Sequence, residues 1–269
     1  AAAESFRSNL VEPLERTGRD VDVFVATAAK DGCDAWFESW RAALGPRLRA
    51  YAIARASRSR SVAFRRSVDL AIRWNVNRRP VHYECDVTDD APPATSAFRA
   101  QILAQTYATI IVARPDAVWR DPAYAASLVS DDVVYTHRCE AHVWRRWQCV
   151  SDVVIAMPAR VFAESLKPCG WAWFNEAHRM RAETPPAHGG FRNFPRRPNA
   201  HHVYRCLNST FPSLRAAFTL PDTQYVNTRE HWVPDLPFAL GRTIFFEPLP
   251  PLATCPAEPW DVRLRLDPK

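Results

Sequence analysis

The chain has 269 residues and a mass of 30.6 kDa, which suits one large domain or two small ones with a sizeable core. Hydrophobic residues make up 47% of it and charged residues 24%, a balance that excludes disordered, collagen-like and coiled-coil proteins. The longest apolar runs, such as residues 109–113, are far shorter than the ~20 residues of a membrane span, so we expect no transmembrane segment.

The formal net charge of +6 comes from arginine, because only Lys30, Lys167 and Lys269 among the 35 basic residues are lysines. Guanidinium groups bind phosphate bidentately, which favours a nucleotide or polyanion partner. A GC-rich genome also enriches arginine, alanine and proline together, so the net charge does not select a partner. Aromatic residues do not interleave with the arginines as in a strand-binding groove, and a nucleic-acid partner is not favoured.

Helical and strand-like patterns alternate along the first half of the chain. Apolar residues at helical spacing from Phe6 to Leu14 predict a helix, and residues 21–27 are typical of a buried strand. The next predicted elements are a helix from Asp34 to Leu44, a strand at 48–54, helices at 64–74 and 95–107, and a strand at 108–113. The last strand is a continuous β-branched run of the kind found at the centre of a sheet.

The second half continues the alternation. We predict a short helix after Asp121-Pro122, strands at 133–136 and 152–157, a helix at 159–166 begun by Pro158, a helix within 201–218 interrupted near Pro212, and a strand at 243–246. Residues 184–199 hold many prolines and glycines and are predicted to form a long loop that acts as a lid. This order of elements predicts an α/β fold with helices on the faces of a sheet.

The seven cysteines show no C-x-x-C pair and no regular spacing. They allow up to three disulfides in a secretory enzyme, or a set of buried thiols in a cytosolic one. Asn208-Ser209-Thr210 is an N-glycosylation acceptor triplet, and no signal peptide is visible. The cysteines and the acceptor triplet together favour an oxidising, Golgi or other secretory lumen, with the cytoplasm as the alternative.

Arg114-Pro115-Asp116 ends the β-branched strand. Open α/β sheets bind ligands outside the carboxyl ends of their strands, so a carboxylate here can hold a metal, a ribose or a sugar hydroxyl. Arg114 can offer its guanidinium fork to phosphate. The alternative is an ordinary turn with a salt bridge.

A second group of residues precedes the predicted strand at 152–157. Trp144 and Trp147 present aromatic faces suited to stacking on a sugar or base, and Asp152 follows at the start of the strand. A carboxylate at a partly buried edge can be tuned for general-base work. The alternatives are that the tryptophans anchor the core and that Asp152 caps the next segment.

These two groups resemble the GT-A-type glycosyltransferases, in particular poorly characterised members from algae and large viruses. The resemblance implies a GT-A-like (Rossmann-like) fold with a mostly parallel central sheet flanked by helices, which binds a nucleotide-sugar donor and a divalent cation, Mn²⁺ or Mg²⁺. By position, Asp116 would bind the metal or donor, Arg114 would replace the first acid of the family's Asp-x-Asp motif, and Trp147 would line the donor site. Asp152 would be the catalytic base for a glycan acceptor.

The same family often provides one more metal ligand or phosphate contact near the C-terminus, and His231 is the candidate here. Imidazole ligates Mn²⁺ or donates to phosphate, although a lone histidine is more often an ordinary surface or core residue.

The prediction is thus a single catalytic domain over residues 1–269, with a donor-binding half (1–130) and an acceptor-side half (131–269). It transfers a sugar from a nucleotide donor to a hydroxyl acceptor. Two rivals stay open: a non-catalytic module that binds carbohydrate or nucleic acid, and a metal-dependent phosphoryl-transfer enzyme that uses Asp116 and Asp152 as ligands. Seven glycines and no Walker motif argue against a phosphate-cradling loop.

Overall fold

A computed structural model gives the fold of the chain over the parts that it describes. These are residues 2–27, 34–53, 60–77, 82–85, 97–115, 117–136, 150, 153–174, 203–219 and 238–240.

Helices and strands alternate over much of this length. The helical segments are α1 (Ala2–Phe6), the π-helical η1 (Arg7–Val11), α2 (Glu12–Arg16), α3 (Asp34–Leu44), the 3-10 turn η2 (Gly45–Arg47), α4 (Arg60–Asn77), α5 (Ala97–Thr106), α6 (Tyr124–Ser127), α8 (Ala159–Ser165), α9 (Gly170–Trp173) and α11 (Val203–Thr210). The strands are β1 (Val23–Thr27), β2 (Leu48–Ile53), β3 (His82–Cys85), β4 (Thr109–Ala113), β5 (Ala117–Trp119), β6 (Val133–Tyr135), β7 (Val154–Pro158), β8 (Ala216–Phe218) and β9 (Phe238–Leu240). Within this part of the chain, no helix combines the length and hydropathy that crossing a membrane requires.

The described strands form three small sheets. In the first, β1, β2 and β3 are adjacent in that order and all parallel. The second has the order β4-β7-β6-β8, in which β7 runs antiparallel to both neighbours and β8 runs parallel to β6. The third pairs β5 with β9 in antiparallel fashion. The predicted mixture of helices and strands is confirmed, and the first sheet is parallel; the prediction of a mostly parallel central sheet is wrong for the second sheet, in which β7 is antiparallel to both neighbours.

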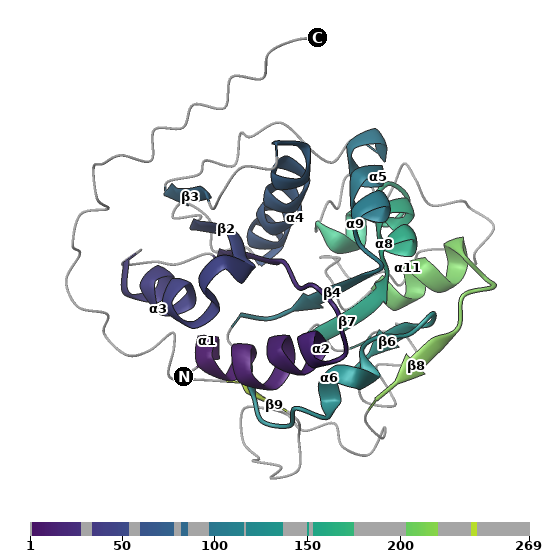
Figure 1. The fold of residues 1–269 in the computed structure, drawn as a ribbon. Helices are drawn as coiled ribbons and strands as arrows, with labels where there is room; N and C mark the ends of the chain where they lie inside the picture. The colour runs from purple at the N-terminus through teal and green to yellow at the C-terminus, as the bar shows by residue number, and fades with distance from the viewer. Residues whose placement is uncertain are drawn as a thin grey trace.

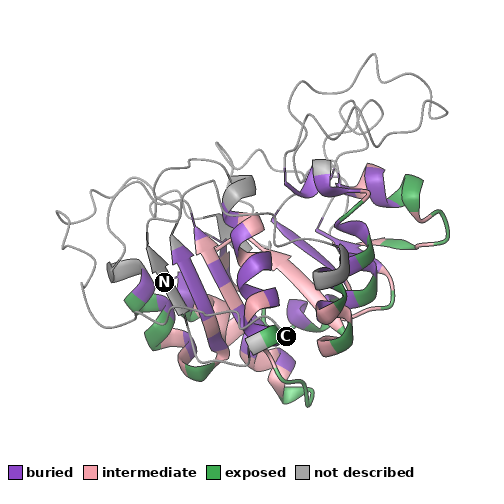
Figure 2. Cartoon of the chain, turned by 90° about the horizontal axis from the view of Figure 1, so that it is seen from above, coloured by how far each residue is buried: buried purple, intermediate pink, exposed green. Residues whose placement is uncertain are grey.

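In Figure 1, β1, β4 and β7 lie between α4, α5 and α8 on one side and α1 and α2 on the other. Ile155 and Met157 of β7 join a hydrophobic cluster with α4, α5, α8 and α11, whereas Val154 and Ala156 join a different cluster with η1, α2 and α6. This alternation follows from the two-residue period of a strand, which sends successive side chains to opposite faces. Both faces of β7 are therefore covered, and the buried residues in Figure 2 run through the middle of the molecule.

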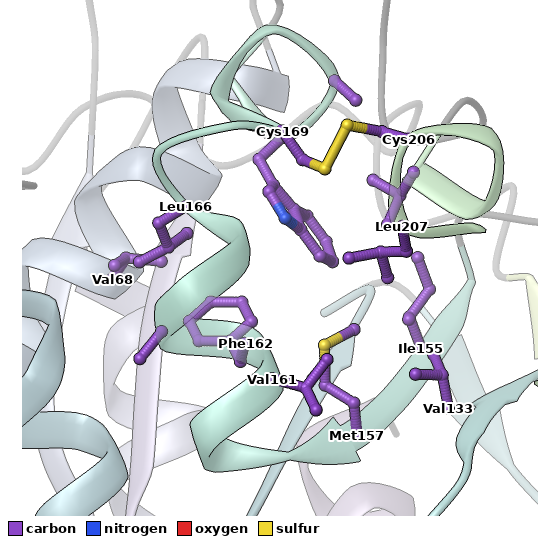
Figure 3. Close-up of a cluster of buried hydrophobic side chains, with 14 of the residues drawn as sticks. Val68, Val133, Ile155, Met157, Val161, Phe162, Leu166, Cys169, Cys206 and Leu207 are labelled. Carbon is purple, nitrogen blue, oxygen red and sulfur yellow. A yellow bond between two sulfur atoms is a disulfide. The ribbon is translucent and has the colours of Figure 1, made fainter. Parts of the chain in front are cut away.

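The larger cluster contains a disulfide between Cys169, just before α9, and Cys206 in α11 (Figure 3). Both half-cystines are buried, and their Cα atoms are 5.7 Å apart, within the range that a disulfide spans. Phe162 of α8 lies in the same cluster, with its ring 5.5 Å from that of Trp173 and 6.3 Å from that of Phe64 in α4. The disulfide thus joins two helical segments over a packed aromatic core.

The position of β4 differs from the prediction. The β-branched run forms a strand as expected, but it lies at the outside of its sheet and is only partly buried, while β7 and β6 are the inner strands. Its apolar residues are explained by the two covered faces: Ile110 and Val112 pack on one cluster, and Ile111 and Ala113 on the other. A continuous apolar run in a strand therefore indicates that both faces of the strand are packed against other elements, and it does not indicate that the strand lies at the centre of its sheet.

Most other predicted elements are confirmed within a few residues. The helix predicted within 201–218 is an exception: it forms as α11 but does not resume after Pro212, where Ala216–Phe218 forms the strand β8 and pairs with β6. Pro158 ends β7 and stands as the N-cap of α8, one position earlier than predicted. The carboxylate of Asp121 accepts a hydrogen bond from the backbone N–H of Ala123 (2.8 Å) just before α6, as its place in the sequence indicates. The predicted loop at 184–199 and the strand at 243–246 lie outside the described residues.

Candidate functional site at the carboxyl end of β4

A tight turn joins β4 to β5. The backbone N–H of Ala117 donates to the carbonyl of Arg114 (3.2 Å), which closes a four-residue turn with Pro115 at its second position. Proline is favoured there because its ring fixes φ near the value that this turn requires. The sequence Arg-Pro-Asp-Ala thereby places Arg114, whose side chain is partly buried, at the carboxyl end of β4.

The start of β7 lies at the same edge. Ala113 pairs with Val154 in the antiparallel register, and the backbone N–H of Arg114 donates to the carbonyl of Val153 (3.0 Å). The candidate acid Asp116 is next to Ala117 in the sequence, and Asp152 is next to Val153. Arg114, two residues before Asp116, is therefore hydrogen-bonded to the residue that follows Asp152, where β4 ends and β7 begins.

Hydroxyl groups gather where β6 and β8 end. The Oγ1 of Thr136 donates to the carbonyl of Val154 (3.2 Å), and the backbone N–H of Thr219 donates to the carbonyl of Tyr135 (3.0 Å). The Tyr124 hydroxyl is 2.8 Å from Thr219 Oγ1. Burial raises the pKa of Tyr124 above its ordinary value near 10. Sequence reasoning missed this group: Thr136 and Thr219 each place a hydroxyl directly after a strand, and Tyr124 is the first residue of α6.

The C-terminal part of the chain reaches β5. Trp119 pairs with Phe238 of β9, and it is almost completely buried. Its backbone is held from the other side by α1 and η1: its N–H donates to Ser5 Oγ (3.1 Å), and its carbonyl accepts from the Nδ2 of Asn9 (2.9 Å). β9 follows His231 in the sequence, and β5 begins directly after Asp116. The pairing of β9 with β5 therefore links the part of the chain after His231 to the part after Asp116.

A separate polar network marks the starts of β1, β2 and β4. Asp22, just before β1, binds Arg49 at the start of β2 with 2.6 Å between Oδ1 and Nε. Its other oxygen accepts a hydrogen bond from the hydroxyl of Tyr107, which precedes β4 (2.9 Å). Asn75 of α4 donates to the same hydroxyl (2.9 Å). This network ties the strands together at the edge where they begin, and the candidate site lies where β4 ends.

Of the predicted site residues, Arg114 is the one that the structure describes. Asp116, Trp147, Asp152 and His231 lie outside the described residues. Among the side chains that the structure does describe, no three of His, Cys, Asp and Glu come together as metal ligands would.

Comparison with known proteins does not add a family to this picture: no family model, no curated protein and no solved structure matches the chain.

Proposed function

We propose that the chain is a glycosyltransferase with a GT-A-like fold, which moves a sugar from a nucleotide-diphosphate donor to a hydroxyl acceptor of a glycan. One observation carries the proposal: the backbone N–H of Arg114, two residues before Asp116, donates to the carbonyl of Val153, the residue after Asp152, where β4 ends and β7 begins. Asp116 and Asp152 are separated in the sequence by a predicted strand and a long connection. The segments next to them, the end of β4 and the start of β7, nevertheless lie side by side.

The first sheet supports a nucleotide donor. Doubly wound folds with parallel strands in the order 3-2-1 and strand 4 beyond strand 1 bind nucleotides outside the carboxyl ends of the strands, where the order reverses. Here β3-β2-β1 is parallel, and the hydrogen bond between Tyr107 and Asp22 links the starts of β4 and β1. The end of β4, with Arg114, is then the expected place for the donor diphosphate.

The proposed roles follow from charge and position. Arg114 offers its guanidinium to the diphosphate, and the indole of Trp147 stacks on the donor. Asp116 and His231 would hold a divalent cation, which supplies positive charge to a departing diphosphate. Asp152 accepts the proton of the acceptor hydroxyl while the oxygen bonds to the anomeric carbon and the bond to the diphosphate breaks. The products are the glycosylated acceptor and the nucleoside diphosphate.

The test measures nucleotide release from a panel of UDP- and GDP-sugars with Mn²⁺ in wild type and in the variants Asp116→Asn and Asp152→Asn. Each variant should lose turnover about a hundredfold or more if its carboxylate acts in the reaction. The exposed Asp131, just before β6, provides the matched control, because Asp131→Asn makes the same chemical change away from the end of β4. Retained turnover in either site variant contradicts the role proposed for that acid.

The rival functions give different outcomes in the same protein. A binding module would be stabilised against heat by glycans or oligonucleotides, the latter with a steep salt dependence, without nucleotide release. A phosphoryl-transfer enzyme would cleave phosphodiesters when metal is added. Stabilisation by nucleoside diphosphates together with sugar transfer supports the proposed activity.

A further inference from the structure

The triplet Asn208-Ser209-Thr210 forms the last turn of α11, on the side of the molecule away from β1 and β2 (Figure 1). All three residues are exposed to solvent, whereas Cys206 and Leu207 just before them are buried. Asparagine-linked glycosylation requires an accessible asparagine followed, after one residue, by serine or threonine. The fold thus leaves the whole acceptor triplet open while it anchors the helix that carries it.

Asn208 lies at the surface of the molecule. It borders a small hollow that is also lined by Tyr204, Leu214 and Arg215. The chain then turns away at Phe211, whose N–H donates to the carbonyl of Leu207 (2.8 Å). Because Asn208 is exposed, its amide nitrogen is open to solvent, where a glycan would be attached.

The disulfide next to the triplet is an independent observation. Cys206 is two residues before Asn208, and it is joined to Cys169. Structural disulfides persist in secretory and extracellular compartments and are rare in the cytosol. Secretory compartments of eukaryotic cells are also where asparagine-linked glycans are added, so the disulfide and the exposed triplet point to the same place.

We propose that Asn208 carries an N-linked glycan in the secretory pathway. In the transfer, the side-chain amide nitrogen of Asn208 bonds to the anomeric carbon of a lipid-diphosphate-linked oligosaccharide. The bond between that carbon and the diphosphate breaks, the amide loses one proton, and the lipid diphosphate leaves. The inference does not depend on the proposed transferase activity, because it concerns what is done to this protein and not what the protein does.

The test expresses the full chain behind a secretion signal in a eukaryotic host and treats the product with a peptide amidase that removes N-linked glycans. We expect the wild type to lose mass on treatment and the released peptide to carry aspartate in place of its glycosylated asparagine. The 269 residues contain no other Asn-x-Ser/Thr triplet, so any shift reports this site alone.

Four variants separate the acceptor motif from other effects. Asn208→Gln and Thr210→Ala should abolish the shift, because one removes the amide and the other removes the hydroxyl that the motif requires. Thr210→Ser and Ser209→Ala should keep it, since both leave an intact acceptor. Non-reducing peptide mapping of the disulfide shows that each secreted variant has folded. A secreted wild type with the Cys169–Cys206 bond intact and no glycan at Asn208 would overturn the proposal.

Discussion

Removal of the Cys169–Cys206 disulfide should strongly destabilise the protein. The bond links positions 37 residues apart, and in the chain-entropy treatment of a cross-link a loop of this length restricts the unfolded chain by about 4 kcal/mol at 25 °C. For a protein of this size, that loss corresponds to a melting temperature lower by roughly 10 °C. The disulfide stabilises the fold mainly by restricting the unfolded chain. Its loss therefore lowers the free energy of unfolding even if the contacts of the folded protein stay the same.

The experiment compares the free energy of unfolding in urea for wild type and two double variants. Cys169→Ala with Cys206→Ala removes the bond and leaves small gaps in the core, whereas Cys169→Val with Cys206→Ala removes the bond and keeps more of the buried volume. If loop closure dominates, both variants lose about 4 kcal/mol relative to oxidised wild type. If packing dominates, the volume-keeping variant recovers most of the loss.

Two outcomes refute the reasoning. Non-reducing peptide mapping that joins Cys169 to a different cysteine shows that the pairing is wrong. A volume-keeping variant within about 1 kcal/mol of oxidised wild type shows that closing this loop contributes little. Reducing agent serves as an internal check, because it should lower the melting temperature of wild type towards that of the double variants.

Two further predictions concern charge and ionisation. The guanidinium of Arg47 binds both carboxylate oxygens of Glu15 (2.6 and 2.8 Å) and joins η2 to α2, so Arg47→Ala should lose about 1 kcal/mol in urea unfolding. Arg41→Ala is its matched control, since the pair between Arg41 and Glu38 is more exposed; an equal loss in the control would contradict the role of the forked geometry. Burial raises the pKa of Tyr135 well above its ordinary value near 10, so the unfolded chain releases this proton first and stability falls as the pH rises above about 10. Tyr135→Phe should flatten that decline in alkaline denaturation curves, and an unchanged decline would refute the assignment.

Local patterns determined the longer elements. The helical spacing around Trp40 and Leu44 and the apolar run at 109–113 depend only on neighbours in the chain, and α3 and β4 form where they predict. The short strands β3, β5, β8 and β9 were not predicted. Strands of three or four residues have little periodicity of their own; β6 was predicted because all three of its residues are apolar and β-branched or aromatic, whereas the other short strands depend on the partners with which they pair.

The sequence predicted which residue types stand at the ends of strands. The tertiary structure showed which of these strand ends lie side by side. Proline and the acid after β4 indicated a turn, which the hydrogen bond from Ala117 to Arg114 confirms. That β7 runs antiparallel to β4, and so begins beside Arg114, was not readable from the sequence, because periodicity assigns a face and not a direction.

The sequence by itself determined the class of the protein: alternating helices and strands, an odd set of cysteines, a single acceptor triplet and an arginine-based positive charge. Only the tertiary structure decided that Cys169 pairs with Cys206, that Asn208 faces solvent, and that the chain beside two distant acids meets at one edge. Those outcomes depend on contacts between segments far apart in the chain, which cooperative packing selects and no local pattern encodes.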